Sequence, residues 1–255
     1  MLAGVLAVVA AVGLVAVAVV LFRTLGRGTD DRDPGGASAG HAGSMLSSLF
    51  LLVFAIAIVV PWTSADAARQ NTYTETQALV ETYWAAAPLP VPDADRLREG
   101  LREYARYVVD DEWPLMAAGR LSPEGTDRLE SLRAYVAGLP VTTDEARDAK
   151  SAVLDRMADL FAARRQRAAD AGTAPPPGVL LLTLVTGVLV IVFPFLAGAR
   201  PRGFALIPVT AMAVLLGVGV YLAWNIAHPF SGGLAVKPDA FVSALHEFQR
   251  IPEGR

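Results

Sequence analysis

The sequence predicts an all-α membrane protein with four transmembrane helices and a helical extramembrane domain inserted between helices 2 and 3. Two observations lead to this prediction. The chain is 53% hydrophobic with a mean hydropathy of +0.42, and its apolar residues are gathered into charge-free blocks. Between the second and third blocks, apolar residues instead recur at helical spacing, and no alternating strand pattern occurs.

Each charge-free block is close to the roughly 20 residues that a helix needs to cross a bilayer. The blocks are residues 1–22, 45–62, 179–198 and 204–226. The first lacks the basic start and the cleavage site of a signal peptide, so we expect a retained transmembrane helix. Residues 23–44 are rich in Gly, Ser, Asp and Pro, and we expect a flexible loop there.

The second block does not end cleanly. A polar but helix-compatible sequence follows Pro61 and runs to about Trp84, before three prolines at positions 88, 90 and 92 stop it. We therefore expect one helix that leaves the bilayer and continues into a water-exposed domain, which covers residues 63–176.

Three further helices are predicted inside this domain. The first begins with Asp93 as its N-cap and kinks or stops at Trp113-Pro114. The second begins at Ser122-Pro123, and the third opens with a capping box of Thr142 and Glu145. Their apolar faces comprise Leu97, Leu101, Tyr104 and Val108, then Leu129, Leu132, Val136 and Leu139, then Val153, Met157, Leu160 and Phe161.

Residues 227–255 form a tail after the fourth block. Pro229 restricts the residue before it, so the fourth helix should end near Ala227, and Gly232-Gly233 permits a sharp reversal. A short helix should follow from Pro238. We expect its apolar face to cover part of the helical domain; this face comprises Phe241, Ala244, Leu245 and Phe248.

The composition excludes several classes of function. A net charge of -3 argues against a nucleic-acid partner, and the absence of cysteine excludes thiolate chemistry. The three histidines have no metal-binding spacing, and no phosphate-binding or nucleophile motif is present. We therefore predict no catalytic residue, no metal site and no cofactor, and the protein is not expected to be an enzyme.

Charged residues are also informative by position. Asp110, Asp111 and Glu112 carry the oxygen ligands that cations prefer, although a solvated acidic helix end is the interpretation we favour. None of the four blocks contains Asp, Glu, Lys or Arg. Ion-coupled transporters usually need such a residue, whereas a channel with a hydrophobic constriction does not.

Three segments carry a resemblance to a known family. They are DAARQNTYTETQALVETYW (66–84), LREYARYVVDDEWPLM (101–116) and HPFSGGLAVKPDAFVSAL (228–245). Together with the order of helices, they make residues 45–245 resemble the bestrophin plan, and more closely the bacterial bestrophin-like membrane proteins of unknown function. The family's PF-G segment corresponds here to His228, Pro229, Phe230, Gly232 and Gly233.

The resemblance implies a pentameric ion channel with an apolar, aromatic pore stripe on the second membrane helix. Residues at four-residue spacing on that helix form the candidate stripe; they are Phe50, Phe54, Ile58 and Trp62. The alternative is that these side chains face lipid or neighbouring helices. Calcium-gated bestrophins carry an acidic run after the PF-G segment, whereas only Asp239 occurs here, so calcium gating is not expected.

We therefore expect a multi-pass protein of the cell membrane that acts as a homo-oligomeric channel, with the lipid bilayer and conducted ions as its partners. The alternative is a non-conducting scaffold or sensor whose helical domain binds a partner. Arginines in both short loops and in the large domain compete to determine the orientation. The resemblance favours the large domain on the cytoplasmic side.

Overall fold

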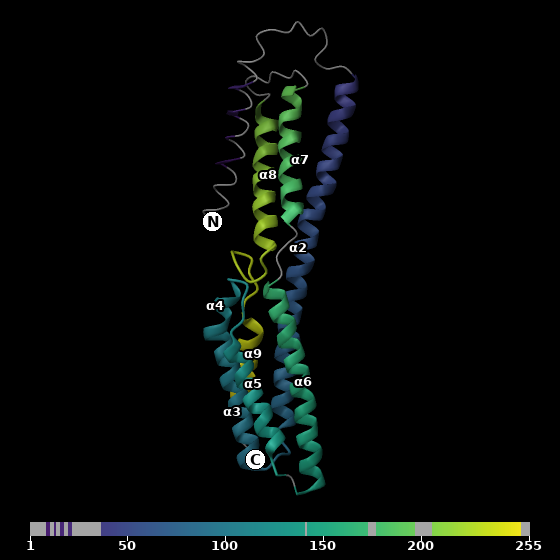
Figure 1. The fold of residues 1–255 in the computed structure, drawn as a ribbon. Coiled ribbons are helices and arrows are strands. Elements are labelled where there is room, and N and C mark those ends of the chain that lie inside the picture. The colour runs from purple at the N-terminus through teal and green to yellow at the C-terminus, as the bar shows by residue number, and fades with distance from the viewer. Residues whose placement is uncertain are drawn as a thin grey trace. The chain divides into compact units, whose positions relative to one another are not determined.

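The computed structural model describes residues 37–140, 142–172, 177–196 and 206–250, together with a few helical residues between 9 and 21. Every regular element in these ranges is a helix, which confirms the all-α prediction for the described part of the chain (Figure 1). The elements are α2 (Ala37–Ala85), α3 (Val91–Tyr107), the π-helix η1 (Val108–Glu112), α4 (Trp113–Met116), α5 (Pro123–Gly138), α6 (Asp144–Gly172), α7 (Pro177–Leu196), α8 (Leu206–Ile226) and α9 (Asp239–Arg250).

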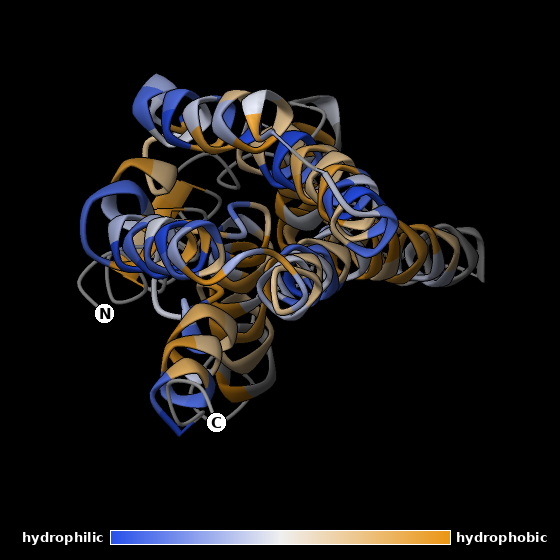
Figure 2. Ribbon diagram, turned by 90° about the horizontal axis from the view of Figure 1, so that it is seen from below, coloured by the Kyte–Doolittle hydropathy of each residue, from blue (hydrophilic) through white to orange (hydrophobic). Residues whose placement is uncertain are grey.

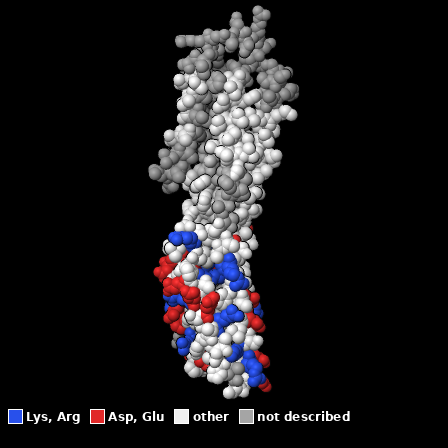
Figure 3. Space-filling model, in the orientation of Figure 1, with Lys and Arg blue, Asp and Glu red and all other residues white. Residues whose placement is uncertain are grey.

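The chain divides into two compact units. Unit 1 contains residues 1–63 and 174–227, and unit 2 contains residues 64–173 and 228–255. Charged side chains gather over the elements of unit 2, and α7 and α8 carry none (Figure 3). The tail beyond residue 227 therefore belongs to the same unit as the predicted extramembrane domain.

The longest element is α2, which runs for 49 residues and contains Pro61 in its interior. The prediction of one continuous helix ending near Trp84 is confirmed. The predicted loop over residues 23–44 was too long, because α2 already begins at Ala37. Residues 37–44 contain three alanines and no proline, so the helix extends backwards through them despite two glycines.

Among the described residues, one helix is long and apolar enough to cross a membrane, and it is the segment Gly43–Ala85 of α2. Leu181–Phe193 and Thr210–Ile226 are shorter apolar helices. Most of the first predicted span lies outside the described residues. The prediction of four transmembrane helices is therefore not confirmed by the structure.

In unit 1, α7 and α8 pack against each other and against α2. Ile191, Ala213 and Leu216 form a small buried cluster, and Phe50 packs against it. A Cβ at Gly187 would lie 2.5 Å from Cδ1 of Leu216, so that side chain would have to shift to admit one. Small residues allow these apolar helices to approach closely, as is common between membrane helices.

Unit 2 is built around one larger core to which α2, α3, α5, α6 and α9 all contribute. Several of its ribbons carry hydrophilic and hydrophobic residues on different sides, as amphipathic helices do (Figure 2). Phe241, Ala244 and Phe248 of α9 are at most 2% exposed in this core, and the ring of Phe248 stacks on Tyr83 at 4.3 Å. The prediction that the tail helix covers the domain is confirmed.

Of the three N-caps predicted from the sequence, one is present in the structure and two are not. Ser122 accepts a hydrogen bond from the amide of Glu124 at 3.2 Å, as predicted. Asp93 is not an N-cap: α3 begins at Val91, and Asp93 instead accepts from the hydroxyl of Tyr135. At α6 the amide of Ala146 donates to Thr143 rather than to Thr142, because the helix begins one residue later than predicted.

Two predicted breaks are also present. The helical path from α3 passes through η1 and the one-turn α4, and it ends after Met116, two residues beyond Pro114. At the other site, α8 ends at Ile226, and Gly232 adopts a φ of 86° in the following loop, where glycine has no Cβ to clash.

Candidate functional site

Four charged side chains meet inside unit 2. Glu75 comes from α2, Glu112 from the end of η1, and Arg164 and Arg167 from α6. Their side chains are between 0% and 4% exposed. Charged groups are rarely buried unless they are paired, so this cluster is the most unusual arrangement in the described chain.

Arg167 connects the two carboxylates. Its Nε donates to Glu75 Oε2 at 2.5 Å, and its Nη2 donates both to Glu75 Oε1 and to Glu112 Oε2 at 3.0 Å. Its Nη1 contacts the sulfur of Met116 at 3.0 Å. The guanidinium of Arg167 therefore forms a two-point pair with Glu75 and bridges it to Glu112.

Arg164 closes the other side of the cluster. Its Nη1 and Nη2 donate to Glu112 Oε2 and Oε1 at 2.8 and 2.6 Å, which is a two-point pair. It also donates to the hydroxyl of Tyr104 at 3.0 Å, and that hydroxyl donates to Glu75 Oε1 at 2.6 Å. The carbonyl of Ser122 accepts a further bond at 2.9 Å.

The electrostatics of the cluster follow from this closed set of bonds. Burial alone would raise the pKa of Glu112, but hydrogen bonding from Arg164 and the charge of Arg167 hold it below its usual range. Burial raises the pKa of Tyr104, and the negative charge of Glu75 raises it further, so the phenol stays a neutral donor. With two carboxylates and two guanidinium groups, the cluster is neutral overall.

The π-helix explains how Glu112 reaches the interior. Its neighbours Asp110 and Asp111 are exposed, as expected for a solvated acidic helix end, whereas Glu112 is fully buried. The interpretation of all three as solvated is therefore wrong for Glu112. A π-turn inserts a residue into the helical repeat and shifts which side chain points inward.

A glycine makes room for Arg164 on the opposing helix. Gly125 is a buried residue of α5, and a Cβ built on it would lie 2.8 Å from Cζ of Arg164. Hydrogen bonds from Arg164 Nε to Thr126 and from the amide of Ser122 to Glu112 further tie α5 to the cluster, at 3.2 and 3.1 Å.

The cluster was not predicted from the sequence, although a signal for it exists. The inward positions of α6 run Val153, Met157, Leu160, then Arg164 and Arg167, at alternating spacings of four and three residues. The two arginines therefore continue an apolar stripe instead of facing solvent. A charged residue in register with a buried stripe is the pattern that indicates a buried ion pair.

The chemistry available to this cluster is limited. The carboxylate oxygens of Glu75 and Glu112 are all occupied by donors. In the described part of the chain, no group of His, Cys, Asp and Glu is arranged to hold a metal ion. The arrangement suits a rigid electrostatic junction between α2, η1, α5 and α6.

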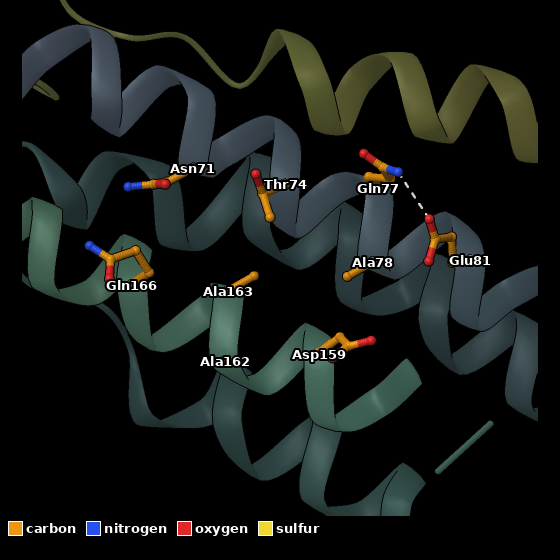
Figure 4. A pocket seen from close by; sticks show the side chains of 9 residues that line it. All are labelled: Asn71, Thr74, Gln77, Ala78, Glu81, Asp159, Ala162, Ala163 and Gln166. Atoms are coloured by element: carbon orange, nitrogen blue, oxygen red, sulfur yellow. Dashed lines mark hydrogen bonds between the residues drawn. The ribbon is translucent and has the colours of Figure 1, made fainter. Parts of the chain in front are cut away.

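A surface groove lies between α2 and α6 in unit 2, with a volume of about 480 Å³. Figure 4 shows alanine side chains between the two helices and polar groups along them. The lining residues are Asn71, Thr74, Gln77, Ala78, Glu81, Asp159, Ala162, Ala163 and Gln166. Gln77 donates to Glu81 at 3.0 Å, and Arg156 pairs with Glu81 at 2.8 Å.

The candidate pore stripe is not uniform in its surroundings. Phe50 and Phe54 stack at 5.5 Å; Phe50 packs on the cluster of α7 and α8, and a Cβ at Gly219 would overlap the ring of Phe54. Ile58 is partly buried, whereas Trp62 is 63% exposed. For the two phenylalanines, these contacts match the alternative that the stripe faces neighbouring helices.

The PF-G segment forms a turn that is packed within unit 2. Phe230 is 6% exposed beside Ala68 and Met116, and its ring meets Trp113 edge to face at 5.7 Å. The amide of Val236 donates to the carbonyl of Pro229 at 2.7 Å, which closes the reversal that Gly232 and Gly233 begin. The amide of Ser231 donates to the carbonyl of His228 at 3.1 Å.

Glu112→Gln should destabilise the protein by roughly 3–5 kcal/mol, because it leaves two buried guanidinium groups facing one carboxylate. Asp111→Asn is the matched control, since the neighbouring acid is exposed, and we expect a change within about 0.5 kcal/mol. Unfolding of the detergent-solubilised protein measures both. If both variants changed stability by the same small amount, the buried pairing would be contradicted.

The same pairing makes stability depend on pH. The folded-state pKa of Glu112 is lowered, so the contribution of this carboxylate to stability is present above its unfolded pKa of about 4.3 and is lost as pH falls below that value.

Gly125→Ala tests the packing around Arg164. Alanine usually stabilises a helix interior by about 1 kcal/mol over glycine, but here its methyl group displaces a buried guanidinium. We expect a net loss of about 1–3 kcal/mol in the free energy of unfolding. Gly138→Ala in the same helix is the control, because a Cβ there meets nothing within 4 Å. A stabilised Gly125→Ala variant would show that Arg164 is not packed against this glycine.

Comparison with known proteins identifies the family of this chain. No curated protein and no solved structure matches this chain. A family model described as the bestrophin-like domain matches residues 8–241, which is most of the chain and includes α2 through the start of α9. The resemblance carried by the three sequence segments is thereby confirmed, and this chain belongs to the bestrophin-like family.

Proposed function

We propose that this bestrophin-related protein crosses the cell membrane four times and assembles as a homo-oligomeric ion channel, a pentamer in keeping with the bestrophin plan. The observation that carries the proposal is the family match over residues 8–241. The absence of charged residues in α7 and α8 supports it, because such helices suit a passive pore better than an ion-coupled pump. We further propose that the large domain is cytoplasmic and that the protein is not an enzyme.

In this proposal α2 supplies the constriction of the pore. Its residues 45–62 are free of charge, and an apolar ring can gate a pore by excluding water. Phe50 and Phe54 lie against α7 and α8 of the same chain. Another face of α2 is more exposed and repeats at spacings of three and four residues; it comprises Leu49, Leu52, Ile56 and Val59, which are 46–60% exposed.

That exposed face and the aromatic stripe are competing candidates for the pore lining, and we favour the exposed face. A side chain that is packed within its own subunit is not available to a central pore. Trp62, the last member of the aromatic stripe, is exposed and sits where interfacial aromatics are common.

The alternative function is a non-conducting scaffold or sensor. The groove between α2 and α6 supports it, because its amide and carboxylate groups offer hydrogen bonds to a polar partner. Flux measurements on purified protein in liposomes distinguish the two functions. If folded, oligomeric protein gave no more ion flux than empty liposomes, the channel function would be excluded.

Within the channel, Ile56→Ala should raise ion flux, because a shorter side chain widens the constriction and lowers the barrier to wetting. Phe54→Ala should instead lower stability, by about 3–5 kcal/mol for a packed phenylalanine, with little gain in flux. Leu181→Ala on α7, at a residue that is 63% exposed, is the control and should change neither. If Phe54→Ala raised ion flux and Ile56→Ala did not, the aromatic stripe rather than the exposed face would line the pore.

A further inference from the structure

The groove between α2 and α6, which we call the α2–α6 groove, has the shape and composition of a helix-docking surface. Ala78, Ala162 and Ala163 lie between the two helices, and amide groups such as those of Asn71 and Gln166 lie along its sides (Figure 4). Small side chains at the centre of such a groove allow another helix to approach closely and to place its own larger side chains there.

Large side chains stand beside this groove, along the exposed face of α2 in unit 2. They are Tyr73, Gln77, Val80 and Trp84, and we call these four residues the α2 ridge. Their spacings of four, three and four residues make them neighbours on one helix face. Tyr73 and Trp84 are 48% and 46% exposed, and Gln77 also lines the groove, so the ridge and the groove adjoin. Tyr and Trp are enriched where proteins meet, and the ridge carries no charge.

The α2 ridge and the α2–α6 groove lie on different faces of the same helix. Tyr73 of the ridge and Thr74 of the groove are consecutive residues, so their side chains point about 100° apart round the helix axis. A projection and a hollow on different faces suit a head-to-tail contact between identical chains, and such contacts close into rings when each one turns the chain.

The charges of the two surfaces are complementary. In the groove, Glu81 and Asp159 share Arg156, at 2.8 and 3.6 Å. At one end of the groove, Asp170 accepts hydrogen bonds from the neutral amides of Asn71 and Gln166, at 2.8 and 3.0 Å. The carboxylates therefore outnumber the arginine that neutralises them.

The ridge brings a positive charge to the same level. Exposed Arg69 lies one turn before Tyr73 on α2. Because Asn71 contacts Asp170 while Glu81 contacts Arg156, α2 and α6 run antiparallel, and Arg69 lies near the level of Asp170. When two copies stand side by side with their α2 helices parallel, Arg69 of one copy lies at the level of Asp170 of the next.

We propose that the α2–α6 groove receives the α2 ridge of a second copy of this chain, and that this contact repeats around a closed ring. The ridge of one copy lies over the alanines of the next, and Arg69 supplies the positive charge that the groove lacks. The inference rests on the proposed homo-oligomer and names the surfaces of unit 2 through which the copies meet.

Cross-linking of the full chain tests the contact. Because the sequence contains no cysteine, each introduced cysteine is unique in its copy. Two copies with different tags are co-expressed, one with Tyr73→Cys and the other with Gln166→Cys. The purified oligomer is treated with a short bismaleimide, and a product that carries both tags can form only between copies. We expect this product.

Ala168→Cys in place of Gln166→Cys is the matched control. Ala168 is exposed and lies two residues further along α6, so its level is nearly the same, but it points about 160° away from Gln166 round the helix. We expect the product to be lost. An oligomer in which Tyr73 cross-links equally with both positions, or only with Tyr73 of another copy, would overturn the groove contact and keep the oligomer. Protein that is monomeric by light scattering would overturn the proposed homo-oligomer itself.

Discussion

The pairing of Glu75 and Glu112 with Arg164 and Arg167 is the constraint on which unit 2 depends. Each charge would be very costly to bury alone, and each is tolerable because the others neutralise it and satisfy its hydrogen bonds. The four residues come from α2, η1 and α6, and α5 is tied in by Ser122 and Gly125. These elements therefore have one arrangement in which all the buried charges are paired, and sliding any of them along its axis breaks the pairing.

This constraint bears on α2 most directly. The helix carries both the charge-free segment before Trp62 and Glu75, three to four turns further on. An apolar core alone would hold α2 in unit 2 with little preference for axial register, since leucines and alanines can repack after a shift. The two-point bond between Glu75 and Arg167 fixes that register, as single buried polar residues do in helical assemblies.

The sequence allowed the helices to be predicted better than the site. Apolar periodicity located α3, α5, α6 and α9, and Ser122 was identified as a cap, because these features are local. Thr142 was misassigned as a cap because the adjacent Thr143 offers the same hydroxyl group. Asp93 was misassigned because α3 begins at Val91, directly after Pro90, without a side-chain cap. Glu112 was interpreted as solvated because a π-turn, which has no simple sequence signature, turns it inward. Arg167, the charged partner of Glu75, lies 92 residues away in the sequence, and such pairing cannot be derived from spacing alone.

A double-mutant cycle on Glu75 and Arg167 tests the central claim most directly. Glu75→Gln or Arg167→Met alone leaves one uncompensated charge in the core, and each should cost roughly 3–5 kcal/mol in the free energy of unfolding. The double variant leaves Arg164 and Glu112 as a balanced pair, so its cost should fall well below the sum of the two, by at least about 2 kcal/mol. If the two single costs simply add, the buried charges do not act as one network, and unit 2 does not depend on their pairing.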